Sequence, residues 1–226
     1  MAHAVIYPHP LTGRTIRLLN IEPGHAGSPL CCSLQERSLD DAFTLYYALS
    51  YCWGTESYRT EITCNSQPLL ITHNLHAVLL EYRRRGINTP LWVDAVCIDQ
   101  SNVTERTSQV RMMQTIYSQA ARVVVWLGKA AATDDMTIEV LKAMYAPWAT
   151  FRDPTSGREL PLFTGQNDAD HDASLAARVP FAYFDALAAF LLRPWFSRIW
   201  MLASLPGEHT NQDTDASQCP GTYLRT

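Results

Sequence analysis

The clearest pattern of apolar and polar positions covers residues 91–128. Residues 91–98 are almost continuously apolar, which is typical of a strand covered on both faces. A polar loop, residues 99–102, follows with side chains that can cap a helix. An apolar stripe then recurs at helical spacing, at Val110, Met113, Tyr117 and Ala120. With a second apolar run at residues 123–127, the pattern predicts a β-α-β unit, and open α/β sheets bind ligands at the carboxyl end of such a strand.

Five further strands, four of them in two hairpins, are predicted nearer the amino terminus. Residues 15–21 read as a strand, and residues 29–34 can pair with it, which predicts an N-terminal hairpin. Residues 43–53 are aromatic and apolar, as expected of a central strand. Residues 61–72 predict a second hairpin that turns at Asn65 and Ser66, with a proline that an edge strand tolerates.

The helix after this hairpin has clear boundaries in the sequence. Thr72 or Asn74 can cap its start, and an arginine triplet at residues 83–85 closes it beside Gly86. Its apolar face consists of Leu75, Val78, Leu79 and Tyr82. The triplet is either a helix end in solvent, the simpler interpretation, or a phosphate-binding patch.

The carboxyl-terminal half contains two more predicted helices, residues 133–145 and 180–192. Between them, residues 149–178 are polar and rich in Gly, Pro and Asp, which predicts a long loop that is either functional or mobile. From residue 203 the composition becomes that of a disordered tail, so we expect the folded part to end near Leu202.

Composition narrows the class of protein. The chain has 226 residues, of which 47% are hydrophobic and 18% charged, as expected of a folded domain. A net charge of -4 gives no electrostatic footprint for nucleic acid or an anionic membrane, so neither is an expected partner. No apolar run approaches the roughly 20 residues of a spanning helix, and the first residues do not resemble a secretory signal, so we expect a cytoplasmic location.

The cysteines and histidines do not predict a metal site. The six cysteines are scattered and form no CxxC pair. Cys52 and Cys97 lie inside apolar runs, where a thiol is usually a small buried hydrophobe. His73 and His76 stand three apart but lack a third ligand nearby in the sequence.

Several blocks, taken in order, resemble the fungal heterokaryon incompatibility (HET) domain. The resemblance extends from residue 15 to 202. No single block would identify the family, but the set of blocks in this order does resemble it. The blocks are residues 16–19, 47–54, 91–100, 126–128 and 193–200, together with Glu105, Arg106, Gln109, Val110, Met113, Ile116 and Tyr117.

This resemblance implies a role in fungal non-self recognition and programmed cell death. The HET family is considered similar to TIR domains, which have a flavodoxin-like α/β fold and some of which cleave NAD. We therefore expect an α/β fold, a flavodoxin/TIR-like three-layer domain with a largely parallel sheet and an N-terminal β-hairpin elaboration. The expected organisation is a lead at residues 1–14, the HET domain at 15–202 and a disordered tail at 203–226. Expected partners are incompatibility or NLR-type receptor proteins, and TIR similarity adds homotypic assembly.

The chain departs from the family pattern after residue 202. HET proteins typically continue with a Gln-Glu pair, where this sequence has Ala203 and Ser204. The nearest carboxylate, Glu208, lies beyond a Pro-Gly pair that would end a helix. The family resemblance and the core-like composition end together, so we interpret the tail as a truncation scar, an altered splice product or a gene-model error.

The resemblance suggests a nucleotide pocket at the carboxyl ends of the strands. Its candidate nucleotide-binding residues are Ser50, Trp53, Gly54, Gln100, Glu105 and Arg106. Its candidate catalytic residues are Asp94 and Asp99, because cleavage of the nicotinamide–ribose bond needs a carboxylate to stabilise an oxocarbenium ion.

Each candidate also has a structural interpretation. Trp53 either stacks on a base or packs in the core. Asp94, inside an apolar run, needs a partner, and Arg106 is the expected one; a structural ion pair is slightly favoured over catalysis. Asp99 and Gln100 can cap the next helix.

Three residues outside this set also have side chains capable of chemistry. Cys97 lacks an adjacent histidine that would make it a nucleophile. Arg193 and Arg198 either hold phosphate or pack within the domain.

Two functions of different classes follow. The first is a death effector or regulator that acts by protein association. The alternative is an NAD-cleaving effector with NAD as its substrate, and a truncated inactive form also fits the altered motif. Whether the protein is an enzyme, and whether it uses any cofactor, is left open by the sequence.

Overall fold

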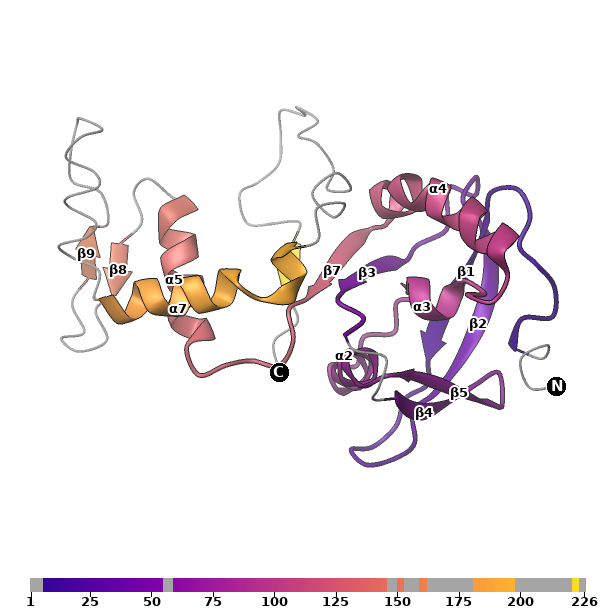
Figure 1. The fold of residues 1–226 in the computed structure, drawn as a ribbon, viewed down its shortest axis with the longest axis horizontal. Coiled ribbons are helices and arrows are strands. Elements are labelled where there is room, and N and C mark those ends of the chain that lie inside the picture. Colours follow the sequence, from indigo (N-terminus) through magenta and orange to yellow (C-terminus); the bar gives the residue numbers. More distant parts are fainter. Residues whose placement is uncertain are drawn as a thin grey trace. The chain divides into compact units, whose positions relative to one another are not determined.

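A computed structural model describes residues 6–54, 59–145, 150–152, 159–161, 181–197 and 221–223. The chain divides into two compact units, the first formed by residues 1–128 with 198–226 and the second by residues 129–197 (Figure 1). The expected borders of a single domain at residues 15 and 202 stay a prediction.

The first unit is a mixed α/β domain around one sheet. Among the described residues the sheet has eight strands in the order β10-β7-β3-β6-β1-β2-β4-β5. Their bounds are β1 Thr15–Ile21, β2 Cys31–Ser38, β3 Tyr47–Tyr51, β4 Arg59–Cys64, β5 Gln67–Thr72, β6 Leu91–Trp92, β7 Arg122–Trp126 and β10 Gly221–Tyr223.

The pairing of these strands corrects the expectation of a largely parallel sheet. β3 is parallel to both β6 and β7, and β10 to β7, but β1 is antiparallel to both of its neighbours. β4 is parallel to β2 and antiparallel to β5. The parallel part is therefore the β-α-β region, while two hairpins make the rest of the sheet mixed.

β3 lies in the middle of the parallel part, as predicted, but it covers only residues 47–51 of the expected 43–53. Tyr47 is opposite Leu91 of β6 on one side and Arg122 of β7 on the other. Ala48 and Leu49 are completely buried, as expected of a strand covered on both faces.

Both predicted hairpins are present. The first runs from the pair Thr15–Ser38 to the pair Ile21–Cys32. The second turns at Asn65 and Ser66, whose φ angles of 50° and 61° are those of a two-residue type I′ turn. β5 ends the sheet order, so its proline occupies an edge strand, where a missing N–H costs little.

Helix α2 (His73–Arg84) follows the second hairpin and packs against β4 and β5. Thr72 caps it by accepting a hydrogen bond from the N–H of Leu75. Its predicted apolar face is buried, and Gly86 with φ of 64° ends it.

The arginine triplet at the end of α2 contacts the protein's own groups, which favours the structural interpretation over a phosphate patch. Arg84 and Arg85 both bond the Glu81 carboxylate, at 2.6 Å each. Arg83 donates to the carbonyl oxygens of Pro29 and Ser28, at 2.9 Å each.

The strand expected over residues 91–98 is wrong beyond Trp92. β6 ends there, and Asp94–Cys97 form a short helix, α3, which packs against β1. The Asp94 side chain accepts from the N–H of Ala95 at 2.8 Å, and the N–H of Cys97 donates to Val93 O at 2.7 Å. A short apolar run does not distinguish a strand from a buried helical turn, so periodicity could not locate this change.

Helix α4 (Val103–Gln119) begins at the predicted loop, where Asn102 accepts from the N–H of Glu105. In Figure 1, α4 and α2 are seen on opposite sides of β3 and β7. The expected core-facing stripe is wrong at Val110, which is 54% exposed. The buried positions include Gln109, which donates to Thr15 O at 2.9 Å, so polar residues with partners in β1 replace part of the apolar face.

The second unit contains α5 (Asp134–Tyr145) and α7 (Phe181–Leu191), which pack against each other and confirm the two predicted helices. A 3-10 helix, Pro194–Ser197, follows α7. Strands β8 (Thr150–Arg152) and β9 (Glu159–Pro161) pair within the predicted long loop, most of which lies outside the described residues.

The predicted tail is described at three residues only, and these form β10 beside β7. In the part of the chain that the structure describes, no helix combines the length and apolar character needed to cross a membrane.

Candidate functional site

The structure brings two of the predicted site residues together at the carboxyl ends of β3 and β6. Trp53 follows β3, and Asp94 follows β6, its parallel neighbour. The indole N–H of Trp53 donates to both carboxylate oxygens of Asp94, at 3.2 and 3.1 Å. Both side chains are partly exposed. The pair is therefore a carboxylate beside an aromatic ring at the edge where such sheets bind ligands.

The expected ion pair between Asp94 and Arg106 is not formed. Asp94 begins a helical turn instead of lying on a strand, and its carboxylate faces Trp53. Gln100 donates its amide to Asp94 O at 2.7 Å, and Arg106 donates to Gln100 O at 3.2 Å. We call the group of Trp53, Asp94, Gln100 and Arg106 the Trp53–Asp94 site.

Asp99 shapes the loop beside this site. Its Oδ1 accepts from the N–H of Ser101 at 3.0 Å and from the Ser101 hydroxyl at 2.7 Å, and the side chain is largely buried. This is an Asx turn, in which a side chain takes the place of a backbone acceptor. The helix cap itself is Asn102, so the expected capping role of Asp99 belongs to its neighbour.

Glu105 lies inside the protein. Its carboxylate is fully buried against Arg17, with a shortest distance of 2.6 Å, and accepts from the backbone N–H groups of Leu11 and Asp99 at 2.9 and 2.8 Å. Burial alone would raise the pKa of the Glu105 carboxyl, but the hydrogen bonds from Arg17, Asp99 and Leu11 outweigh it and hold the pKa below its ordinary value. These contacts give Glu105 a structural role that ties α4 to β1 and to the N-terminal segment.

Ser50 and Gly54, two further candidate residues, differ in exposure: Ser50 lies within β3, and Gly54 lies in the segment that follows it. Ser50 lies in the buried part of β3. Gly54 has φ of 78°, a conformation that favours glycine, and among the described residues, its chain neighbours aside, no atom lies within 4 Å of where a Cβ would stand. Ser50 is enclosed in the sheet, whereas Gly54 is exposed.

Two residues missed by the sequence analysis hold this region together. Arg17 is buried in β1, donates to His9 O at 2.7 Å and lies over the Tyr7 ring. A charge inside an apolar strand was the available signal, because such a charge needs a partner. Asn74 of α2 donates to Cys52 O at 2.6 Å and accepts from the Trp126 indole at 2.8 Å, which joins the ends of β3 and β7.

The structure also accounts for other side chains considered for chemistry. Burial raises the pKa of the Cys97 thiol to about 12, which disfavours a nucleophilic thiolate. Arg193 pairs with Asp134 at 2.7 Å and lies over the Phe190 ring, both within the second unit, while Arg198 lies outside the described residues. Among the described side chains, no group of three or more His, Cys, Asp or Glu is placed to hold a metal.

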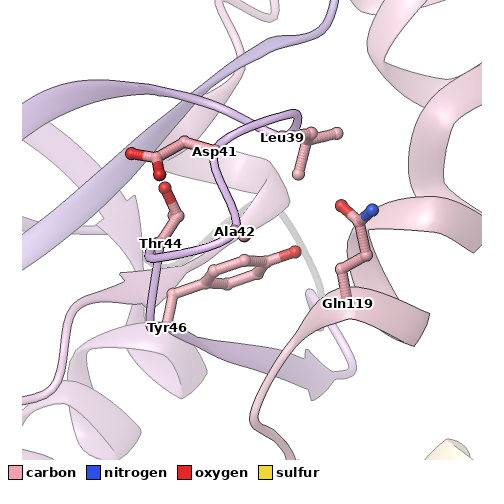
Figure 2. Close-up of a pocket in the computed structure, with 6 residues that line it drawn as sticks. All are labelled: Leu39, Asp41, Ala42, Thr44, Tyr46 and Gln119. Carbon is pink, nitrogen blue, oxygen red and sulfur yellow. The ribbon is translucent and has the colours of Figure 1, made fainter.

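A small cavity of about 180 Å³ lies at the other end of β3. Figure 2 shows Tyr46 and the preceding loop on one side of it and Gln119, at the end of α4, on the other. The Tyr46 hydroxyl donates to Ile116 O at 2.6 Å, which fixes the ring in the wall. None of the predicted site residues lines this cavity, so it is separate from the Trp53–Asp94 site.

Comparisons with known proteins connect this geometry to a family. The profile of the family described as "Heterokaryon incompatibility protein (HET)" matches residues 46–203, a range that contains the Trp53–Asp94 site. The chain is also 35% identical over 140 residues to "Heterokaryon incompatibility protein 6, OR allele" of Neurospora crassa. That match covers 56% of this chain and 20% of the relative, so the chain spans about a fifth of the relative's length. No solved structure matches. Because the family profile covers more than half of the sequence, the chain belongs to the heterokaryon incompatibility (HET) family.

Proposed function

We propose that this chain is an effector of fungal non-self recognition and programmed cell death that acts by associating with other proteins in the cytoplasm. The observation that carries the proposal is the HET match over residues 46–203, together with a relative named for heterokaryon incompatibility. The partners we propose are incompatibility or NLR-type receptor proteins and further copies of the chain.

Exposed apolar side chains support action by association. Phe43 is 94% exposed and Leu45 62% exposed, on the loop that leads into β3. A protein surface of this kind gains free energy when a partner covers it, and aromatic side chains often anchor such contacts. The loop is therefore the part of the described surface that we expect a partner to bind.

The test replaces this apolar pair with polar residues. The double variant Phe43→Ser/Leu45→Ser should kill fewer cells than the natural chain when it is induced in a fungal host, while its thermal stability stays unchanged because both side chains are already exposed. The matched control is Leu70→Ser, which alters a side chain of β5 that is 55% exposed and should leave killing intact. Equal killing by all three proteins would exclude this loop, and equal loss in the control would indicate a general effect of surface polarity.

A second candidate function is cleavage of NAD, and the Trp53–Asp94 contact favours it. Water would add to C1 of the ribose and release a proton to solvent as the bond to nicotinamide breaks, with nicotinamide taking the bonding electrons. The Asp94 carboxylate would stabilise the positive charge on the ribose, and Trp53 would stack on the nicotinamide ring. The parallel order β7-β3-β6, connected through α4, supports a flavodoxin- or TIR-like core as part of this proposal.

Nicotinamide release from NAD by the purified chain tests this second candidate. If the chain cleaves NAD, Asp94→Asn should abolish release, because the neutral amide cannot stabilise the oxocarbenium charge. The control Glu61→Gln removes an exposed carboxylate of β4 and should keep the natural rate. An Asp94→Asn variant as active as the natural chain would remove Asp94 from the reaction, and no release by the natural chain would remove the candidate.

A further inference from the structure

Cys32 and Cys64 face each other across two neighbouring strands. Cys32 lies on β2 and Cys64 on β4, and the two residues are direct partners in this parallel pairing. Neighbouring strands lie about 4.7–4.9 Å apart. That spacing falls within the range of about 4.4–6.8 Å that Cα atoms of disulfide-linked cysteines span. Because partners in register project to the same face of a sheet, the two thiols lie side by side.

The surroundings of the pair affect the ionisation of the two thiols in opposite directions. Both residues are buried, with exposed fractions of 3% for Cys32 and 0% for Cys64. A hydrogen bond between the thiols raises the pKa of Cys32, with burial adding to the increase. The same hydrogen bond lowers the pKa of Cys64 against the opposing effect of burial. The Cys32 thiol also donates to Thr63 O at 3.3 Å, which gives its proton a fixed acceptor and leaves Cys64 as the sulfur that attacks.

We propose that Cys32 and Cys64 are an oxidation site of this chain, where hydrogen peroxide produces a reversible disulfide. The Cys64 thiolate attacks one peroxide oxygen, the O–O bond breaks, and hydroxide leaves, which converts Cys64 to a sulfenic acid. The Cys32 sulfur then attacks the Cys64 sulfur, forming the S–S bond, and the departing oxygen leaves as water with the proton of Cys32. Two thiols are oxidised and one peroxide is reduced to two molecules of water.

The disulfide would fasten a short junction in the sheet. β2 and β4 are paired at two positions only, Cys31–Thr63 and Cys32–Cys64. Backbone bonds from Thr63 to Leu30 and from Asn65 to Cys32, at 2.9 and 3.0 Å, extend that junction slightly. A covalent link there joins the β4–β5 hairpin, and the start of α2 that follows it, to the first hairpin.

A link at this position would be suited to regulation because closing it would strain the sheet. Disulfides prefer Cβ separations of about 3.5–4.5 Å. The usual spacing between neighbouring strands, roughly 4.7–4.9 Å, is wider, so the link would draw the two strands together. Strained disulfides are the more easily reduced ones, and intracellular disulfides that form transiently are those used in redox sensing.

Cys97 and Cys31 are the neighbouring cysteines that could form a disulfide in place of the proposed one. Cys97 raises the pKa of Cys32, and Cys64 raises the pKa of Cys97, so the three thiols are near one another. The Cys97 sulfur, however, contacts Val93 N at 3.3 Å and Leu91 O at 3.7 Å. Cys31 precedes Cys32 on the same strand, so its side chain projects from the opposite face of the sheet.

The experiment treats the full chain with hydrogen peroxide, digests it without reductant and identifies linked peptides by mass spectrometry. We expect one linked pair, Cys32–Cys64, lighter by two hydrogen atoms than the separate peptides and lost on treatment with dithiothreitol. The melting temperature should rise on oxidation, because the link restricts the unfolded chain.

Two variants provide the controls. Cys31→Ser should still form the link and show the same rise in melting temperature. Cys64→Ser should form no link and melt at the same temperature before and after peroxide. If Cys64→Ser folds poorly, the presence or absence of the Cys32–Cys64 linked peptide in the natural chain still tests the proposal. A link from Cys64 to Cys97, or sulfinic acid with no link, would overturn the proposal.

Discussion

Arg17 and Glu105 are opposite charges in the core of the first unit, and each depends on the other. Their closest atoms are 2.6 Å apart, and both side chains are almost completely hidden from water. Removing a charge from water costs several kcal/mol, which a close partner and further hydrogen bonds offset. Here the backbone at residues 9, 11 and 99 supplies those bonds, so the pair connects the N-terminal segment with β1 and α4.

Removing one member of this pair should destabilise the fold strongly. Glu105→Ala leaves the buried Arg17 charge to the partly exposed Glu36 carboxylate, 3.7 Å from Arg17 Nε, so we expect the free energy of unfolding in urea to fall by about 3 kcal/mol. The exposed pair Arg14–Asp40, also at 2.6 Å, is the control. Asp40→Ala should cost about 0–1 kcal/mol because solvent screens that pair. Similar losses in the two variants would contradict the account.

The pH dependence of stability should report the same carboxylate. The folded-state pKa of Glu105 lies below its ordinary value of 4.5, so its contribution is complete above that pH and is lost as the pH falls through the lower folded value. Urea unfolding below about pH 4.5 should therefore show stability decreasing with acidification, with a shallower slope in Glu105→Gln than in the natural chain. Identical slopes would show that Glu105 does not titrate differently in the two states.

At the scale of residues, the sequence predicts which side chains lie in the same region better than it predicts which of them form a contact. Trp53 and Asp94 were both assigned to the carboxyl ends of the strands, and they are in contact. The assigned partner of Asp94 was wrong because a helical turn, not a strand, sets the direction of its side chain. The role of Arg17 cannot be predicted from local sequence, because its partner Glu105 is 88 residues away.

At the scale of elements, hairpins and capped helices were predictable because turn and cap residues encode them locally. Asn65 and Ser66 predict a turn, and Thr72 predicts a helix start, where the structure has them. The cap of α4 is Asn102, from the predicted loop but not one of the two residues assigned the role, Asp99 and Gln100. The apolar run at residues 91–98 was ambiguous, and the mixed character of the sheet follows from pairings between distant strands. Short-range patterns contain no information on which strands become neighbours.

The turn between β4 and β5 allows a stabilising substitution. Ser66 has φ of 61°, a left-handed conformation that is unfavourable for residues other than glycine. Ser66→Gly should therefore raise the free energy of unfolding by about 1 kcal/mol. Asn65→Gly is the matched control: it relieves the same strain but removes the bond from Leu34 N to the Asn65 side chain, so it should not stabilise. Equal stabilisation by both changes in urea denaturation would refute this explanation.

At the scale of the whole molecule, the family could be recognised from ordered blocks that individually are weak. The matched range, residues 46–203, extends through β3, α3, α4 and β7. It also ends where the Gln-Glu pair typical of the family is replaced by Ala203 and Ser204. The one carboxylate that the structure places against Trp53 is Asp94, among the residues it describes. The two candidate functions therefore differ in whether they require the Asp94 carboxylate: NAD cleavage does, and association does not.

Viability and cellular NAD, followed together after induction in a fungal host, test the central claim most directly. Cultures expressing the natural chain and the Asp94→Asn variant are sampled at the same times. An effector that acts by association should kill both cultures, with NAD constant until viability falls. NAD loss that precedes death in the natural culture and is absent with Asp94→Asn would contradict association and establish catalysis. Survival of the natural culture would contradict an effector role altogether.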